Sequence, residues 1–185
     1  MNMFETIRIR RAIRKYTSQP VEEEKLLQVL EASRLAPTWA NKQCCKVIVI
    51  RSQETKEALS EISNVPGSGY PLNPARKSLV SAPIVLVICA DPELSGNMYG
   101  KEYYLVDVGI VMDHIMLTAA SQGLGTCFVG VFDEEKVKRL LDVPANIRVV
   151  GITPLGYPER WPDARPRKVL NELVAYEKWA EQPYA

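Results

Sequence analysis

The sequence YLVDVGIVMDHIMLTAASQGLGTCFVGVFD, residues 104–133, covers almost all of the longest apolar stretch of the chain. Residues 104–122 are apolar on nearly every side, which is typical of a helix buried at the centre of a protein. Two aspartates and a histidine interrupt the run, so we interpret it as a buried helix and not as a membrane span. A strand is predicted over residues 126–132, directly after this helix.

Helix and strand patterns alternate on both sides of this stretch. Helical spacing of apolar residues is found over 21–36, 53–62 and 133–141, and β-branched runs are found over 47–50, 84–89 and 147–155. Pro37 ends the first helix, and Ser52 is the expected N-cap of the second. The alternation predicts a mixed α+β architecture in one domain that spans residues 1–185.

The composition narrows the function classes. The chain has 185 residues, 46% of them hydrophobic, and its 23 Lys and Arg nearly balance its 22 Asp and Glu. A formal charge of +1 is not the basic excess of a nucleic-acid-binding protein, so nucleic acid is not an expected partner. We expect no signal peptide, no membrane association and no secreted disulfide framework, which together predict a cytoplasmic protein.

The only histidine limits the possible catalytic groups. His114 lies inside the predicted central helix, so zinc sites with several histidines and histidine-based nucleophilic triads are not expected. We interpret His114 as a packed helix residue and predict no metal site. Cys44 and Cys45 are adjacent, but an adjacent-residue disulfide is strained, and two buried thiols are the preferred interpretation.

The glycines of GLGTCFVG, residues 123–130, resemble a dinucleotide-binding loop. The third glycine comes two positions late, and the run follows a helix and enters a strand, so the Rossmann interpretation fails on its context. A helix C-cap at Gly123 followed by a turn explains the same glycines.

Two basic segments, one near each end of the chain, are candidates for an anion site. Their basic residues are Arg10, Arg11 and Arg14 in RRAIRKY, and Arg165, Arg167 and Lys168 after the prolines of the C-terminal segment. Guanidinium groups match the geometry of phosphate oxygens. Taken alone, the N-terminal segment is more often a solvated basic turn, and the C-terminal one a charged linker.

Four ordered motifs together resemble the nitroreductase family across nearly the whole chain. They are RRAIRKY at residues 10–16, APTWANKQ at 36–43, GLGTCFVGVFD at 123–133, and GYP with RPRK at 156–168. The resemblance implies an α+β fold of the nitroreductase type: a three-layer α/β/α sandwich with a mainly antiparallel sheet, assembled as an intertwined homodimer. Residues 157–185 would form a C-terminal arm that packs on the partner subunit.

The resemblance also implies an FMN site at the subunit interface. The phosphate would be bound by Arg10, Arg14, Arg165 and Arg167, with Arg11 as a further cofactor-binding residue. The isoalloxazine ring would lie between Pro37, Thr38 and Asn41 of the neighbouring subunit and Phe128, Val129 and Gly130. A backbone N–H near Gly130 would donate to flavin N5, and Lys77 would lie near the pyrimidine edge.

The implied activity is FMN-dependent reduction of nitroaromatics, quinones or related small acceptors by NAD(P)H, with ping-pong kinetics. No catalytic side chain is required, because the flavin supplies the chemistry. Two alternatives remain open: a flavin-binding or storage module without turnover, and an enzyme of the same scaffold with other flavin chemistry, such as dehalogenation, flavin destruction, enone reduction or dehydrogenation. The chain departs from the family pattern at Ala12, where serine is common, and at Cys44 and Cys45, where Pro-Trp is common.

Overall fold

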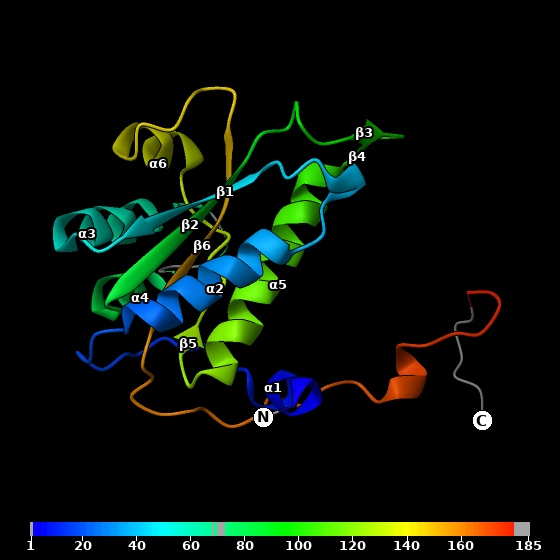
Figure 1. Ribbon diagram of the computed structural model, residues 1–185, viewed down its shortest axis with the longest axis horizontal. Helices are drawn as coiled ribbons and strands as arrows, with labels where there is room; N and C mark the ends of the chain where they lie inside the picture. Colours follow the sequence, from blue (N-terminus) through cyan, green and yellow to red (C-terminus); the bar gives the residue numbers. More distant parts are fainter. Residues whose placement is uncertain (1, 68, 70–72, 180–185) are drawn as a thin grey trace.

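A four-stranded antiparallel sheet forms the centre of the computed structural model, which describes residues 2–67, 69 and 73–179 (Figure 1). In spatial order its strands are β1 (Cys45–Ile50), β2 (Ile84–Ala90), β6 (Arg148–Gly156) and β5 (Gly125–Thr126). Each neighbouring pair is antiparallel. Strand β2 is buried along its whole length, as expected for a strand covered on both faces.

Alternate residues of β2 enter two separate hydrophobic cores. Leu86 and Ile88 pack with the helices α2 (Glu23–Leu35) and α5 (Tyr103–Ser121). Val85 and Val87 pack on the other side, with side chains of α3 (Gln53–Ile62), α4 (Arg76–Ser81) and α6 (Glu134–Leu140). Because successive side chains of a strand point to opposite faces, the helices form a layer on each side of the sheet. The three-layer α/β/α arrangement is confirmed.

Helix α5 is long and apolar enough, by length and composition alone, to cross a membrane. In this structure it packs against α2 and against the strands β1, β2 and β6. Val108 and Ile115 on its inner side are fully buried. The helix is therefore the central packing element of one layer, as its sequence predicted.

The predicted helices and the three long strands are confirmed to within a few residues. Ser52 and Asp133 cap their helices through side-chain oxygens that accept backbone N–H groups. Gly123 follows the last turn of α5 with a φ of +76°, a left-handed conformation that favours glycine. The helix before Pro37 ends at Leu35, because a residue that precedes proline is driven out of the helical region.

The strand predicted over residues 126–132 is wrong beyond Thr126. Only Val129 pairs with the sheet again, in an isolated bridge with Ile152. Between these points the Cys127 N–H donates to the side-chain hydroxyl of Thr153 and not to a backbone carbonyl. A side chain thus replaces the ladder bond, and the chain leaves the sheet edge.

Several short elements were not anticipated. They are α1 (Met3–Ile9), the 3₁₀ turn η1 (Trp39–Asn41), the hairpin of β3 (Asn97–Met98) and β4 (Lys101–Glu102), helix α4, and a second 3₁₀ turn η2 (Leu170–Glu172). Of the loop expected over residues 64–74, residues 68 and 70–72 lie outside the described part.

The segment after β6 runs beneath the sheet past α1 and then away from the body of the molecule (Figure 1). Its apolar side chains are exposed, including Leu170, Leu173 and Trp179, the last at 93%. Residues 180–185, with Tyr184, lie outside the described residues. The packing of this arm on a partner subunit stays a prediction.

Candidate functional site

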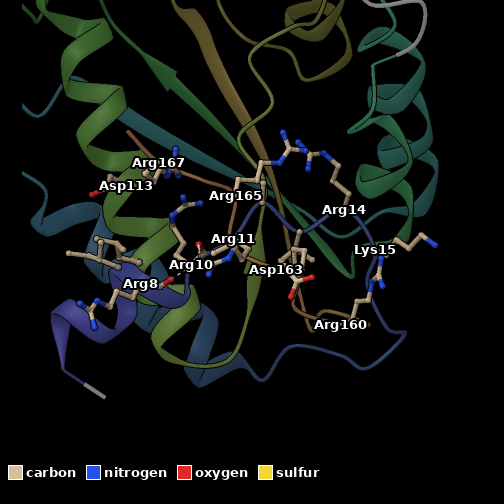
Figure 2. A pocket seen from close by; sticks show the side chains of 16 residues that line it. Arg8, Arg10, Arg11, Arg14, Lys15, Asp113, Arg160, Asp163, Arg165 and Arg167 are labelled. Atoms are coloured by element: carbon tan, nitrogen blue, oxygen red, sulfur yellow. Dashed lines mark hydrogen bonds between the residues drawn. The ribbon is translucent and has the colours of Figure 1, made fainter. Parts of the chain in front are cut away.

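A cavity of about 870 Å³ lies where the N-terminal segment and the C-terminal arm meet on α5 (Figure 2). Eight of its lining side chains are cationic: Arg8, Arg10, Arg11, Arg14, Lys15, Arg160, Arg165 and Arg167. The carboxylates that line it are Asp113 and Asp163. Such an excess of positive charge in one hollow attracts and holds an anion.

The N-terminal arginines are positioned by attachment of their segment to the sheet. Ala12 forms a parallel bridge with Thr126 of β5, and Ile13 and Tyr16 are buried. The Tyr16 hydroxyl donates to the Ile13 carbonyl at 2.9 Å, which fixes the turn between them. Arg14 stays exposed between these two anchors and reaches the cavity.

The C-terminal arm is held at its start. Tyr157 donates its hydroxyl proton to Glu22 of the α2 N-terminus at 2.6 Å and accepts a hydrogen bond from Lys25. Two residues later, the Glu159 N–H donates to the Lys15 carbonyl at 3.2 Å. The arm therefore begins beside the N-terminal segment, and the following residues return to the same cavity.

The guanidinium groups of Arg14 and Arg165 point toward one another, although they come from opposite ends of the chain (Figure 2). Within the described residues, none of the eight cations forms an ion pair, even though two carboxylates line the same cavity. Like charges that face each other repel, and an anion between them removes the repulsion.

Arg11 supplies a second indication of an anion. Its Nη1 donates to the backbone carbonyls of Arg8 and Arg10 at 2.5 and 2.9 Å, which caps the end of α1. Its Nε is buried and has no hydrogen-bond acceptor within the described structure. An unpaired buried donor costs about 1–3 kcal/mol, so an incoming acceptor oxygen is favoured there. Converging arginines with an unused donor fit a phosphate group.

The segment after β5, which was predicted to line the flavin ring, does not line this cavity. Val129 is buried and uses both its N–H and its carbonyl in the bridge to Ile152. Phe128 is 46% exposed. Gly130 is exposed, and the described part of the chain offers its N–H no acceptor. The backbone N–H of Gly130 is thus free within the described part of the chain.

The loop with Pro37, Thr38 and Asn41 lies at the other end of α5, beside the β3–β4 hairpin and away from α1 (Figure 1). Ala40, Asn41 and Gln43 all have positive φ values, between 46° and 55°. For residues other than glycine, such a backbone costs on the order of 1–3 kcal/mol each and is concentrated at functional sites. The structure does not bring this loop to the arginines of the same chain.

Lys77 lies on α4 in a separate hollow between α3 and α4, with Glu57, Glu61 and Arg76. It does not line the arginine cavity, and its proposed place near the flavin pyrimidine edge stays a prediction. Arg8, Lys15, Arg160 and the two cavity carboxylates were missed by the sequence interpretation. For all but Asp113, which lies on α5, the one signal was proximity to the basic motifs, which also applies to many solvated residues.

The adjacent cysteines are free thiols with sulfur atoms 3.8 Å apart. Burial raises the pKa of both, and the hydrogen bond to Asp107 adds to the rise at Cys44. Both therefore keep their protons at neutral pH. Cys44 is buried as predicted, whereas Cys45 is only partly buried, so the interpretation of two buried thiols is wrong for Cys45. Among the described residues, no three His, Cys, Asp or Glu side chains are grouped so as to hold a metal ion.

The model of the family described as "Nitroreductase family" matches residues 7–157 of this chain. The chain belongs to the nitroreductase family. A nitroreductase family protein from Clostridium novyi NT is 35% identical, with a TM-score of 0.80 over 98% of this chain and 97% of that one.

Two further relatives match at the sequence level. A Methanothermobacter thermautotrophicus protein, whose name gives NADH dehydrogenase and NAD(P)H nitroreductase, is 30% identical over 97% of this chain and 88% of its own length. An FMN reductase [NAD(P)H] from Bacillus subtilis is 27% identical over 90% of this chain and 71% of its own length.

Proposed function

We propose that this nitroreductase family chain is an NAD(P)H-dependent FMN oxidoreductase that reduces nitroaromatics, quinones or related small organic acceptors. The observation that carries the proposal is the convergence of eight cationic side chains from both ends of the chain on one cavity. A phosphate-bearing cofactor matches this charge, and the names of the relatives supply the flavin and the nicotinamide.

The arginines bind and orient the cofactor. Arg10, Arg14, Arg165 and Arg167 would hold the FMN phosphate, and the unpaired Nε of Arg11 offers a further donor. When bound, FMN accepts hydride from NAD(P)H and passes electrons to the acceptor. The chain itself contributes binding, orientation and exclusion of water.

The ring end of the site requires a second copy of the chain. The loop that contains Thr38 and Asn41 lies at the N-terminal end of α5, away from α1, so these residues are proposed to reach the flavin of the other subunit (Figure 1). Exposed apolar side chains on α1 and α5, among them Phe4, Leu105 and Val106, support a homodimer. The free N–H of Gly130 is the proposed donor to flavin N5.

A flavin-storage module would use the same binding residues, so binding alone does not separate the two functions. The decisive experiment is rapid anaerobic mixing of the FMN-loaded protein with NADH and, separately, with NADPH, followed by a panel of quinones and nitroaromatics. Fast bleaching of the bound flavin and its recovery on addition of an acceptor are expected for an oxidoreductase. Bound flavin that neither nicotinamide bleaches would instead identify a storage module.

A further inference from the structure

Asp107 is a buried carboxylate, 2% exposed, in the second turn of α5. It accepts hydrogen bonds from three separate donors. The Trp39 backbone N–H donates to Oδ1 at 2.7 Å, and the Ser95 hydroxyl and the Cys44 thiol donate to Oδ2 at 3.0 and 3.3 Å. A buried charge is tolerated only when it is satisfied in this way.

Two of the three donors lie on either side of one short loop. Trp39 precedes and Cys44 follows residues 40–43, which include three residues with left-handed backbone. Inside the loop, the Gln43 N–H donates to the Thr38 hydroxyl at 2.9 Å. Strained backbone persists only where its surroundings fix it. The carboxylate holds both ends of this loop and thereby fixes it.

Cys44 gives the arrangement a feature particular to this chain. Proline has no side-chain donor, whereas a thiol donates a weak hydrogen bond that a carboxylate acceptor strengthens. Burial and the contact with Asp107 raise the pKa of Cys44, so the thiol keeps its proton at neutral pH. The departure from the family's Pro-Trp pattern thus supplies a third donor to the carboxylate.

We propose that Asp107, together with Cys44, is a positioning residue that sets the conformation of the acceptor loop, defined as residues 38–43. This inference rests on the proposed function, which places Thr38 and Asn41 against the flavin ring of the other subunit. Asp107 touches no reacting group and acts only through the loop. The loop then presents its side chains to the acceptor without having to order when the acceptor binds.

The test compares Asp107→Asn, Cys44→Ala and Cys44→Ser in the FMN-loaded protein. The Asn side chain keeps its shape but turns one acceptor into a donor that faces Ser95 and Cys44. Loss of a hydrogen bond to a charged group changes an equilibrium constant by roughly tenfold or more. The opening equilibrium of the loop should shift by this factor, so amide exchange over residues 38–43 should accelerate at least about tenfold. The KM of the acceptor should rise by a similar factor, and the absorption spectrum of the bound flavin should shift.

The FMN dissociation constant should change less than about threefold in Asp107→Asn, because the phosphate site lies elsewhere. Cys44→Ser keeps a donor and should retain the parent's loop exchange and acceptor KM. Cys44→Ala lacks the donor, so its loop should exchange faster and its KM should be higher. Cys89→Ala, at a buried cysteine on β2, is the matched control. It should lower the melting temperature and leave the loop and the flavin spectrum unchanged.

The outcomes separate the inference from the proposed function. If Asp107→Asn lowers only the melting temperature, with parental loop exchange, KM and flavin spectrum, then Asp107 is a core residue and the inference is wrong. If the parent binds no FMN, the proposed function fails, and parental loop exchange in the variants would overturn the positioning role as well. If Asp107→Asn does not fold, Cys44→Ala and Ser95→Ala decide the same question.

Discussion

The backbone N–H of Ile13 donates to the carbonyl of Thr126 at 2.8 Å, and this bond attaches the N-terminal arginines to β5. Gly125 makes the approach possible, because a Cβ at this position would lie 2.5 Å from Cγ1 of Ile13. The N-terminal segment that carries Arg10 and Arg14 is therefore in direct contact with the edge of the sheet.

Gly125→Ala should displace the N-terminal segment. Overpacking of a tight contact typically costs about 1–3 kcal/mol, and we expect a loss of this size in the free energy of unfolding. FMN affinity should fall in parallel, since Arg10 and Arg14 move with the segment. Denaturant unfolding and flavin titration measure the two effects. In an Ile13→Ala background the cost should shrink, and strictly additive effects would contradict the proposed contact.

Arg14→Ala and Arg167→Ala should each weaken FMN binding by roughly tenfold to a hundredfold, the equivalent of one charge-assisted hydrogen bond. Riboflavin, which lacks the phosphate, should bind parent and variants almost equally. Lysine at either position should rescue only in part, because an ammonium group loses the planar fork. Arg139→Ala on α6 is the control. Fluorescence titrations in which both alanine variants bind FMN like the parent would leave these arginines as ordinary surface charges.

Val106→Glu should convert the proposed homodimer into a monomer. Val106 is 53% exposed on α5, and a charge there would be buried without a partner at the proposed interface. FMN affinity should drop as well, because every contact of the second subunit with the flavin ring is lost, whereas Asp107→Asn leaves the acceptor loop beside the ring. Light scattering and flavin titration are the measurements. Leu140→Glu, on an exposed residue of the opposite helix layer, should leave the assembly intact.

Steady-state kinetics should follow a ping-pong pattern. One stacking surface over the flavin is proposed to serve nicotinamide and acceptor in turn, so the two would not occupy it together. Double-reciprocal plots at several acceptor concentrations should give parallel lines. Intersecting lines, or isolation of a stable ternary complex, would show that donor and acceptor have separate sites.

Stability should fall at alkaline pH because of the buried thiols. Burial raises the pKa of Cys89 to about 11, whereas an unfolded cysteine titrates near about 8.5. Above about pH 8.5 the unfolded chain loses protons that the folded chain keeps, so the free energy of unfolding decreases as pH rises toward about 11. Urea unfolding at neutral and alkaline pH measures this decrease. The decrease in the free energy of unfolding should be smaller in Cys89→Ala. Equal decreases in the parent and the variant would show that Cys89 is not its source.

The sequence predicted the parts of the fold that depend on an apolar period. Every residue of β2 is buried, and buried residues recur along the whole central helix. Their apolar patterns in the sequence are therefore unambiguous. Helix α1 was missed because Met3 and Phe4 are largely exposed and the helix has almost no buried face. Strand β5 was predicted too long because the hydroxyl of Thr153, distant in sequence, takes the place of a backbone partner.

In the candidate site too, residues within a local motif were predicted, and residues positioned by partners distant in sequence were missed. The arginines were identified because their two motifs belong to the set of four that resembles the nitroreductase family, and the structure brings both motifs to one cavity. Asp107 was noted in sequence only as an interruption of an apolar run. Its partner Trp39 is 68 residues away in the chain, and no local pattern connects the two.

The cavity wall formed by residues 160–167 separates cofactor binding from the formation of the cores. These residues follow the last strand of the sheet, and neither of the two large hydrophobic cores contains any of them. The stability that a bound ligand adds by mass action is therefore transmitted through a segment on which the packing of the sheet does not depend.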